Sequence, residues 1–127
     1  MITKFKIFES NNLDDLIIKC IEENCYKPLS ILDKEYVMKF ILNTLWHNLD
    51  SVNFKELIKY NFPLNVQDDQ GNTVLLIYTT RDNIEMVKIL IAAGVDLNIK
   101  NEAGNTALNY TNNKTLIKLL KSNGAKE

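Results

Sequence analysis

Two stretches of this chain repeat each other over most of their length. Residues 64–75 read LNVQDDQGNTVL, and residues 97–108 read LNIKNEAGNTAL. The preceding residues keep the same interval, since FKELIKYNFPLN ends at Asn65 and VKILIAAGVDLN ends at Asn98. The chain therefore has a 33-residue period from about residue 54 to residue 108. A period of this length indicates stacked supersecondary units, because a single unit cannot bury its apolar face alone.

Each unit is expected to form two helices joined by a turn and followed by an extended connection. Thr73 is suited to cap a short apolar helix that begins with VLLIY, because its hydroxyl can accept a backbone N–H. Asp82, with Glu85 three residues later, resembles a capping box and predicts that Asp82 caps the second helix. A wide apolar face then runs from Ile84 to Ala92, and the polar stretch DLNIKNEAG leads to the next unit.

The four glycines fall where this interpretation needs them. Gly71 and Gly104 lie in the turn before a first helix, and Gly94 and Gly124 lie after a second helix. Glycine is the residue that most readily adopts the positive φ of such turns. In the earlier unit Asn61 takes the place of the helix-ending glycine, and asparagine tolerates that conformation better than most residues do.

With these features the chain resembles the ankyrin-repeat family, which has a period of 33 residues and the signature T-P-L-H-x-A. Both copies keep the threonine and the leucine of that signature, and Leu76 and Asn109 stand at its histidine position. Residues 83–98, NIEMVKILIAAGVDLN, are similar to the family's second helix and the hairpin that follows it. The resemblance covers about residues 40–124. It implies an all-α repeat fold, a solenoid of about three helix–turn–helix repeats.

We expect four parts along the chain. Residues 1–33 form an N-terminal segment and a capping helix, and residues 34–66 form a degenerate ankyrin-like repeat with helices near 34–47 and 51–60. Residues 67–99 form an ankyrin repeat, and residues 100–127 form a shortened C-terminal capping repeat. Terminal repeats of a solenoid need such caps, because their outer faces meet solvent.

Local signals give the boundaries of the two caps. The N-terminal capping helix is expected from Leu13 to Asn24, with Pro28 as the residue that breaks it. Gly104 to Gly124 is three residues shorter than the equivalent span in the middle repeat, which predicts a clipped turn at Asn112–Asn113.

Few residues suggest catalysis or metal binding. Cys20 and Cys25 are five positions apart, about 140° around a helix, so they do not converge on a metal and are expected to be buried structural thiols. The one histidine, His47, lies near a predicted helix end, where it favours the helix dipole. No glycine-rich phosphate-binding motif is present. The sequence predicts no enzyme, no cofactor and no metal site.

Charge and hydropathy exclude two classes of partner. The net charge is −1, and no apolar run approaches the roughly 20 residues that span a bilayer, so we expect neither nucleic acid nor a membrane as partner. Lys114, Lys118, Lys121 and Lys126 make the C-terminal end mildly basic, which we interpret as a solubilising cap. Two cysteines without a disulfide framework predict a cytoplasmic location, or a host cell's cytoplasm if the chain is a delivered effector.

The resemblance implies a function in protein–protein interaction. In the family, partners usually meet the hairpin tips and the exposed side of the first helices. Carried over to this sequence, the expected protein-binding residues are Tyr36, His47, Asp69, Gln70, Asn72, Thr80, Arg81, Lys100, Glu102 and Asn105. Tyrosine and arginine are enriched at interface hot spots, so Tyr36 and Arg81 are the expected anchors. The alternative for each residue is an ordinary solvated side chain.

Several roles fit such a module. It is expected to bind another protein, whose identity the sequence does not specify, as an inhibitor, an antidote or an effector. The alternative is a structural or self-associating scaffold piece, which the alternating pattern of MITKFKIF would favour, although we expect a monomer rather than a homo-oligomer. A third hypothesis is an enzyme with a site near His47.

Overall fold

The computed structural model describes residues 13–45 and 51–127, apart from the side chains of residues 45 and 51–53. These parts of the chain contain helices, turns and irregular segments and no strand, so the predicted all-α repeat fold is confirmed. In chain order the elements are α2 (Leu13–Glu22), the 3₁₀ turn η1 (Pro28–Ile31), α3 (Lys34–Phe40), the π-helical turn η2 (Ile41–Leu45), α4 (Ser51–Lys59), α5 (Val74–Thr80), α6 (Ile84–Ala92), the 3₁₀ turn η4 (Ala107–Tyr110) and α7 (Lys114–Ser122).

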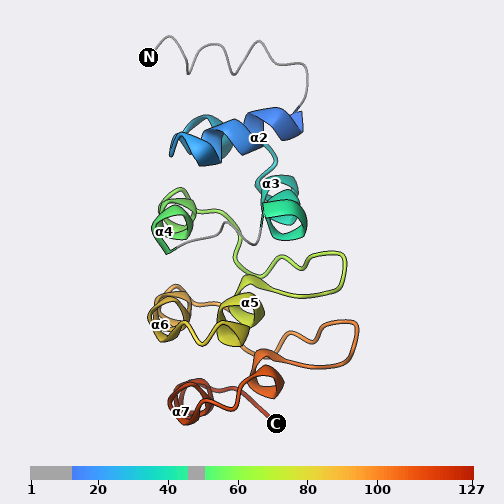
Figure 1. Cartoon of the computed structure of the whole chain (residues 1–127), viewed down its shortest axis with the longest axis vertical. Coiled ribbons are helices and arrows are strands. Elements are labelled where there is room, and N and C mark those ends of the chain that lie inside the picture. The colour runs from blue at the N-terminus through green and yellow to red at the C-terminus, as the bar shows by residue number, and fades with distance from the viewer. Residues whose placement is uncertain (1–12, 46–50) are drawn as a thin grey trace.

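The helices stack in layers along the long axis of the molecule (Figure 1). One column contains α3, α5 and η4, and the other contains α4, α6 and α7. Helix α2 lies at the N-terminal end of the stack. Two long loops project to the same side, beside the column of α3, α5 and η4.

The core lies between the two columns. Phe54 of α4 and Tyr78 of α5 are almost fully buried, and their rings meet edge to face with centroids 5.7 Å apart. Val87 and Leu90 of α6 and Leu116 of α7 are fully buried farther along the same column. One continuous apolar core therefore runs through the described stack.

Helix α5 is short because it is held at its start and buried along nearly its whole length. The Thr73 hydroxyl accepts the Leu76 N–H at 3.4 Å, which confirms the predicted cap. Every residue from Val74 to Thr79 is buried. The buried Thr79 hydroxyl donates to the Leu75 carbonyl at 2.7 Å, so its hydrogen-bonding capacity is satisfied inside the helix.

The predicted N-terminal capping helix ends earlier than expected. Helix α2 stops at Glu22, and Asn24 then adopts a positive φ of 54°. Asn24 therefore accounts for the end of the helix, and the prediction that Pro28 breaks it is wrong. Pro28 instead begins η1, where its missing N–H costs no hydrogen bond. Cys20 and Cys25 are both buried, as predicted.

The cap of α6 also differs from the prediction by one residue. Asn83 is the N-cap, and its side-chain oxygen accepts the Met86 N–H at 3.1 Å. Asp82 has a φ of 52°, which is outside the extended range of an N-cap. Its carboxylate instead accepts the Thr111 hydroxyl at 3.4 Å. The capping box centred on Asp82 is therefore wrong.

The shortened repeat loses residues from its first helix, not from its turn. Helix α5 has seven residues and η4 has four, while residues 81–83 and 111–113 form connections of equal length. The predicted clipped turn at Asn112–Asn113 is therefore wrong. Thr106 and Asn109 form a capping box around η4, in which the Asn109 side chain accepts the Thr106 N–H at 2.8 Å.

Two other local predictions agree with the structure. The helices expected near 34–47 and 51–60 correspond to α3 with η2 and to α4, although residues 46–50 are outside the described residues. Asn61 has a φ of 60° and Gly94 a φ of 85°, so the asparagine does replace the glycine after a second helix. The division of the chain into four parts stays a prediction.

Candidate binding surface

The two projecting loops are hairpins with the same internal construction. We call residues 66–73 the first hairpin and residues 99–106 the second hairpin. In the first, the Asp68 carboxylate accepts the N–H groups of Gln70 and Asn72 at 2.9 and 2.8 Å. In the second, the Asn101 side-chain oxygen accepts those of Ala103 and Asn105 at 3.0 Å each. Asp68 and Asn101 are 33 residues apart, so the period places a turn-forming side chain at the same point of both hairpins.

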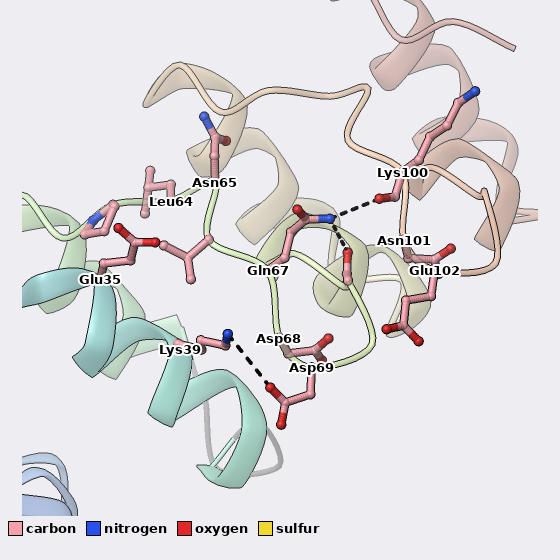
Figure 2. A pocket seen from close by; sticks show the side chains of 13 residues that line it. Glu35, Lys39, Leu64, Asn65, Gln67, Asp68, Asp69, Lys100, Asn101 and Glu102 are labelled. Atoms are coloured by element: carbon pink, nitrogen blue, oxygen red, sulfur yellow. Dashed lines mark hydrogen bonds and ion pairs between the residues drawn. The ribbon is translucent and has the colours of Figure 1, made fainter.

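Hydrogen bonds join one hairpin to the other. The Glu102 N–H donates to the Gln70 carbonyl at 3.0 Å. The Gln67 side-chain amide donates to the Lys100 carbonyl at 3.0 Å and to the Gly71 carbonyl at 2.8 Å (Figure 2). Because these bonds involve backbone groups, they fix the spacing of the hairpins and not only the direction of their side chains.

The first hairpin is also tied to the preceding helical layer. The Asp69 N–H donates to the Asn43 side-chain oxygen at 2.8 Å. The Asp69 carboxylate lies 4.0 Å from the Lys39 ammonium of α3 (Figure 2). Both side chains of this ion pair are exposed, so it contributes little to the stability of the fold. The backbone hydrogen bond is the stronger constraint on the position of the hairpin tip.

Two recesses border the hairpins. The first, which we call the hairpin pocket, has a volume of about 840 Å³ and lies between α3 and the two hairpins (Figure 2). The second, which we call the concave groove, has a volume of about 570 Å³ and lies between the hairpins and the first-helix column. The concave groove is lined by Asp68, Gln70, Asn72, Leu76, Ile77, Thr80, Asn101, Glu102, Ala103 and Tyr110.

Tyr110 sits where the second hairpin meets the concave groove. Its phenol oxygen accepts the side-chain N–H groups of Asn101 at 2.8 Å and Asn105 at 3.4 Å. The hydrogen bonds from Asn105 and Asn101 stabilise the phenolate and lower the pKa of Tyr110 from its ordinary value. The side chain is partly exposed, so its hydroxyl can reach a molecule bound in the groove.

A family model for three copies of the ankyrin repeat matches residues 45–127 of the chain. The chain belongs to the ankyrin-repeat family. Ankyrin repeats are generally protein–protein interaction modules and are typically non-enzymatic. None of the curated protein sequences searched matches this chain.

Six of the predicted binding residues line the recesses of this ankyrin-repeat chain. Gln70, Asn72, Thr80 and Glu102 border the concave groove, and Asp69, Lys100 and Glu102 border the hairpin pocket. Asn105 reaches the groove through Tyr110. The hairpins of this ankyrin-repeat chain thus bring together most of the residues that the family resemblance singled out.

The two expected anchors lie elsewhere. The Tyr36 hydroxyl donates to the Asp14 carboxylate of α2 at 2.8 Å, and this hydrogen bond raises the pKa of Tyr36. The Arg81 guanidinium lies 5.8 Å from the centre of the Tyr78 ring. Neither residue lines the hairpin pocket or the concave groove. His47 lies outside the described residues.

Sequence reasoning missed three lining residues that the period would have found. Asn101 is the equivalent of Asp68, and Tyr110 is the equivalent of the groove residue Ile77, in both cases at 33 residues. Ala103 lies one residue before Gly104, at the tip of the second hairpin. Each position could have been read from the alignment of the two repeats, before any side chain was placed.

Two features are absent from the residues that the structure describes. No helix in residues 13–45 and 51–127 is long and apolar enough to cross a membrane. Over the same part of the chain, no group of three or more histidine, cysteine, aspartate or glutamate side chains is arranged to hold a metal ion.

Proposed function

We propose that this chain binds a partner protein through the concave groove and the tips of its two hairpins. The observation that carries the proposal is the composition of the groove, to which α5, η4 and both hairpins each contribute side chains. Elements from separate repeats thereby form one surface. A partner that contacts this surface would touch residues from 68 to 110 at once.

The rigidity of the hairpins supports this proposal. The bond from the Glu102 N–H to the Gln70 carbonyl and the bond from Gln67 to the Lys100 carbonyl hold the hairpins in one arrangement. A loop that is ordered before binding loses little conformational entropy when a partner docks. The binding free energy is therefore available for affinity and is not spent on ordering the hairpins.

The chemistry of the groove also suits a protein partner. Its floor contains Leu76 and Ile77, which are largely covered by neighbouring residues, and its border contains the exposed Thr80, Ala103 and Glu102. An apolar centre with a polar border is the usual anatomy of a protein–protein interface. Within this proposal the chain acts in a cytoplasm as an inhibitor, an antidote or an effector, since each of these roles needs only a rigid binding surface.

A matched pair of arginine substitutions tests the proposed surface. Ala103→Arg places a long charged side chain at the groove border, and Ala92→Arg makes the same change on an exposed position of α6. Partners would be captured from the source organism with the wild-type chain and both variants, after thermal unfolding has shown that all three fold alike. We expect a partner that is retained by Ala92→Arg and lost by Ala103→Arg.

Two outcomes would contradict the proposal. A partner retained by Ala103→Arg and lost by Ala92→Arg would place binding on the outer helices. If the wild-type chain captured no protein, the interaction function itself would be in question.

Self-association is a second candidate, favoured by apolar exposure in the N-terminal part of the chain. Ile31 is 79% exposed, and Leu13 and Tyr36 are 40% and 44% exposed. Sedimentation equilibrium over a range of concentrations would detect a dimer, and Ile31→Asp would abolish it if Ile31 lies in the contact. A single monomer mass at all concentrations would exclude this candidate.

A further inference from the structure

We infer that the partner presents an extended, basic peptide segment, and that one of its lysine or arginine side chains enters the concave groove beside Asp68 and Glu102. This inference rests on the proposed function and specifies the chemistry that the groove recognises. It follows from the charge of the lining, the apolar floor and the hydrogen-bonding state of Tyr110.

The charged lining of the concave groove is entirely acidic. Asp68 and Glu102 are the charged residues among its lining residues, and no lysine or arginine is among them. The nearest basic residue of the second hairpin, Lys100, lines the hairpin pocket and not the groove. In Figure 2 the Lys100 ammonium points away from the carboxylates of Asp68 and Glu102. A cation entering the groove would therefore meet two carboxylates without a competing ammonium from its lining.

The turn does not consume the whole of the Asp68 carboxylate. One oxygen, Oδ1, accepts the N–H groups of both Gln70 and Asn72. These two bonds hold the carboxylate in a fixed direction, and an ionised carboxylate has acceptor sites for further donors on its second oxygen. Asp68 can thus serve the turn and a bound cation at the same time.

The floor of the groove selects a long basic side chain over a small cation. Leu76 and Ile77 line it together with the aromatic ring of Tyr110. Lysine and arginine bury their aliphatic stems on apolar surface while the charged end stays polar. A cation near the face of a tyrosine ring gains further attraction. The groove offers both kinds of contact to one side chain.

The Tyr110 hydroxyl adds a donor for the peptide backbone. The Asn101 side-chain oxygen accepts two backbone N–H groups, so the direction of its amide is fixed and its NH₂ group must donate to Tyr110. Asn105 also donates to the same phenol oxygen. With two donors directed at its oxygen, the phenol has its own proton to give to an acceptor. The carbonyl of an extended peptide is such an acceptor, which distinguishes a peptide segment from a simple amine.

The experiment uses a display library of random seven-residue peptides selected on the full chain. We expect selected peptides to share a lysine or arginine at one position. A synthetic peptide from that selection would then be titrated against the wild-type chain and four variants, Glu102→Gln, Asp68→Asn, Tyr110→Phe and the control Glu22→Gln, which changes an exposed carboxylate of α2. Asp68→Asn keeps an oxygen that can accept the two N–H groups of the turn.

The expected effects are modest because the groove is open to solvent. Glu102→Gln and Asp68→Asn should each weaken binding about threefold, and the double variant about tenfold, while Glu22→Gln should leave it unchanged. Binding should also weaken as the salt concentration rises. Tyr110→Phe should weaken binding without reducing this dependence on salt, because it removes a neutral donor.

Three outcomes would overturn the inference. These are a selection that yields no peptide, selected peptides without a shared basic residue, and a basic peptide that the double variant binds as tightly as wild type. None of these would contradict the proposed function if Ala103→Arg still abolishes capture of the partner. A partner retained by Ala103→Arg would instead refute the proposed function itself.

Discussion

The backbone of Gly71 packs directly against the backbone of Asn101. A Cβ atom at residue 71 would lie 2.9 Å from the Asn101 Cα and 2.9 Å from the Glu102 nitrogen. At Gly104, the equivalent position of the second hairpin, a Cβ atom would meet no neighbouring atom within 4 Å. The two glycines share a sequence position in the repeat, yet only the first lies under another hairpin.

Substitution of these two glycines by alanine should separate backbone strain from hairpin packing. Both have similar positive φ values, 79° and 78°, so alanine costs roughly 1–2 kcal/mol at each for conformation alone. Gly71→Ala should lose about 1–3 kcal/mol more, because two rigid backbones must move apart. Urea unfolding of the two variants measures the difference. Equal losses would show that the hairpins do not pack as described.

The side chain of Asn101 should stabilise the second hairpin and its contact with the first. Asn101→Asp keeps an oxygen for the Ala103 and Asn105 N–H groups but removes the donor to Asn72 and Tyr110. The loss of two partly exposed hydrogen bonds should reduce the free energy of unfolding by about 1–2 kcal/mol.

The exposed Asn112 provides a control for this substitution. Asn112→Asp makes the same chemical change and should alter the free energy of unfolding by less than about 0.5 kcal/mol. Chemical denaturation at neutral pH compares the two. If Asn101→Asp were as stable as Asn112→Asp, the donated bonds of Asn101 would have no energetic role.

The choice of Asn83 as helix cap gives a third prediction. Asn83→Ala removes the bond to the Met86 N–H and should cost about 1 kcal/mol. Asp82→Gly should cost less, because glycine adopts the φ of 52° at that position with less strain than aspartate. Thermal unfolding of both variants decides between the caps. A larger loss for Asp82→Gly would restore Asp82 as the important residue of this turn.

The repeat-level features of the fold could be predicted because they recur. The 33-residue period, the glycines and Asn61 each mark a point where one unit ends and another begins. The cap of α6 could not be predicted as well, because Asp82 and Asn83 are adjacent and both suit a cap. Backbone conformation decides between them, and a conformation set by tertiary packing is not written in the local sequence.

The candidate site was predictable for the hairpins and less so for single side chains. The repeat pattern located Gln70, Asn72 and Glu102 on the hairpins, and those residues do border the groove. Tyr36 was expected near the first hairpin tip, but it hydrogen-bonds to Asp14 of α2, a contact between residues that no repeat relates. Contacts between a repeat and a non-repeated segment are tertiary, so the period holds no information about them.

Two tyrosines should ionise in a defined order. Hydrogen bonds donated by Asn105 and Asn101 lower the pKa of Tyr110, whereas the hydrogen bond to Asp14 raises the pKa of Tyr36. Tyr110 should therefore ionise at lower pH than Tyr36. NMR titration of carbon-labelled tyrosine rings, with Tyr110→Phe and Tyr36→Phe for assignment, measures both midpoints. The reverse order would contradict the hydrogen bonds described for both hydroxyls.

The same shifts have opposite consequences for stability at alkaline pH. The fold favours the phenolate of Tyr110, so its contribution appears above the pKa of the unfolded state and is lost as pH falls through the folded pKa. The fold favours the neutral form of Tyr36, so its contribution is present below the unfolded pKa and is lost as pH rises through the folded pKa. At neutral pH only the contribution of Tyr36 is present.

The most direct test of the central claim is photo-cross-linking from two exposed positions in the source organism. One chain would carry benzoylphenylalanine in place of Thr80, at the border of the concave groove, and the other would carry it in place of Lys88, on α6. The account predicts an adduct with a partner protein from position 80 and none from position 88. An adduct from position 88 alone would contradict it.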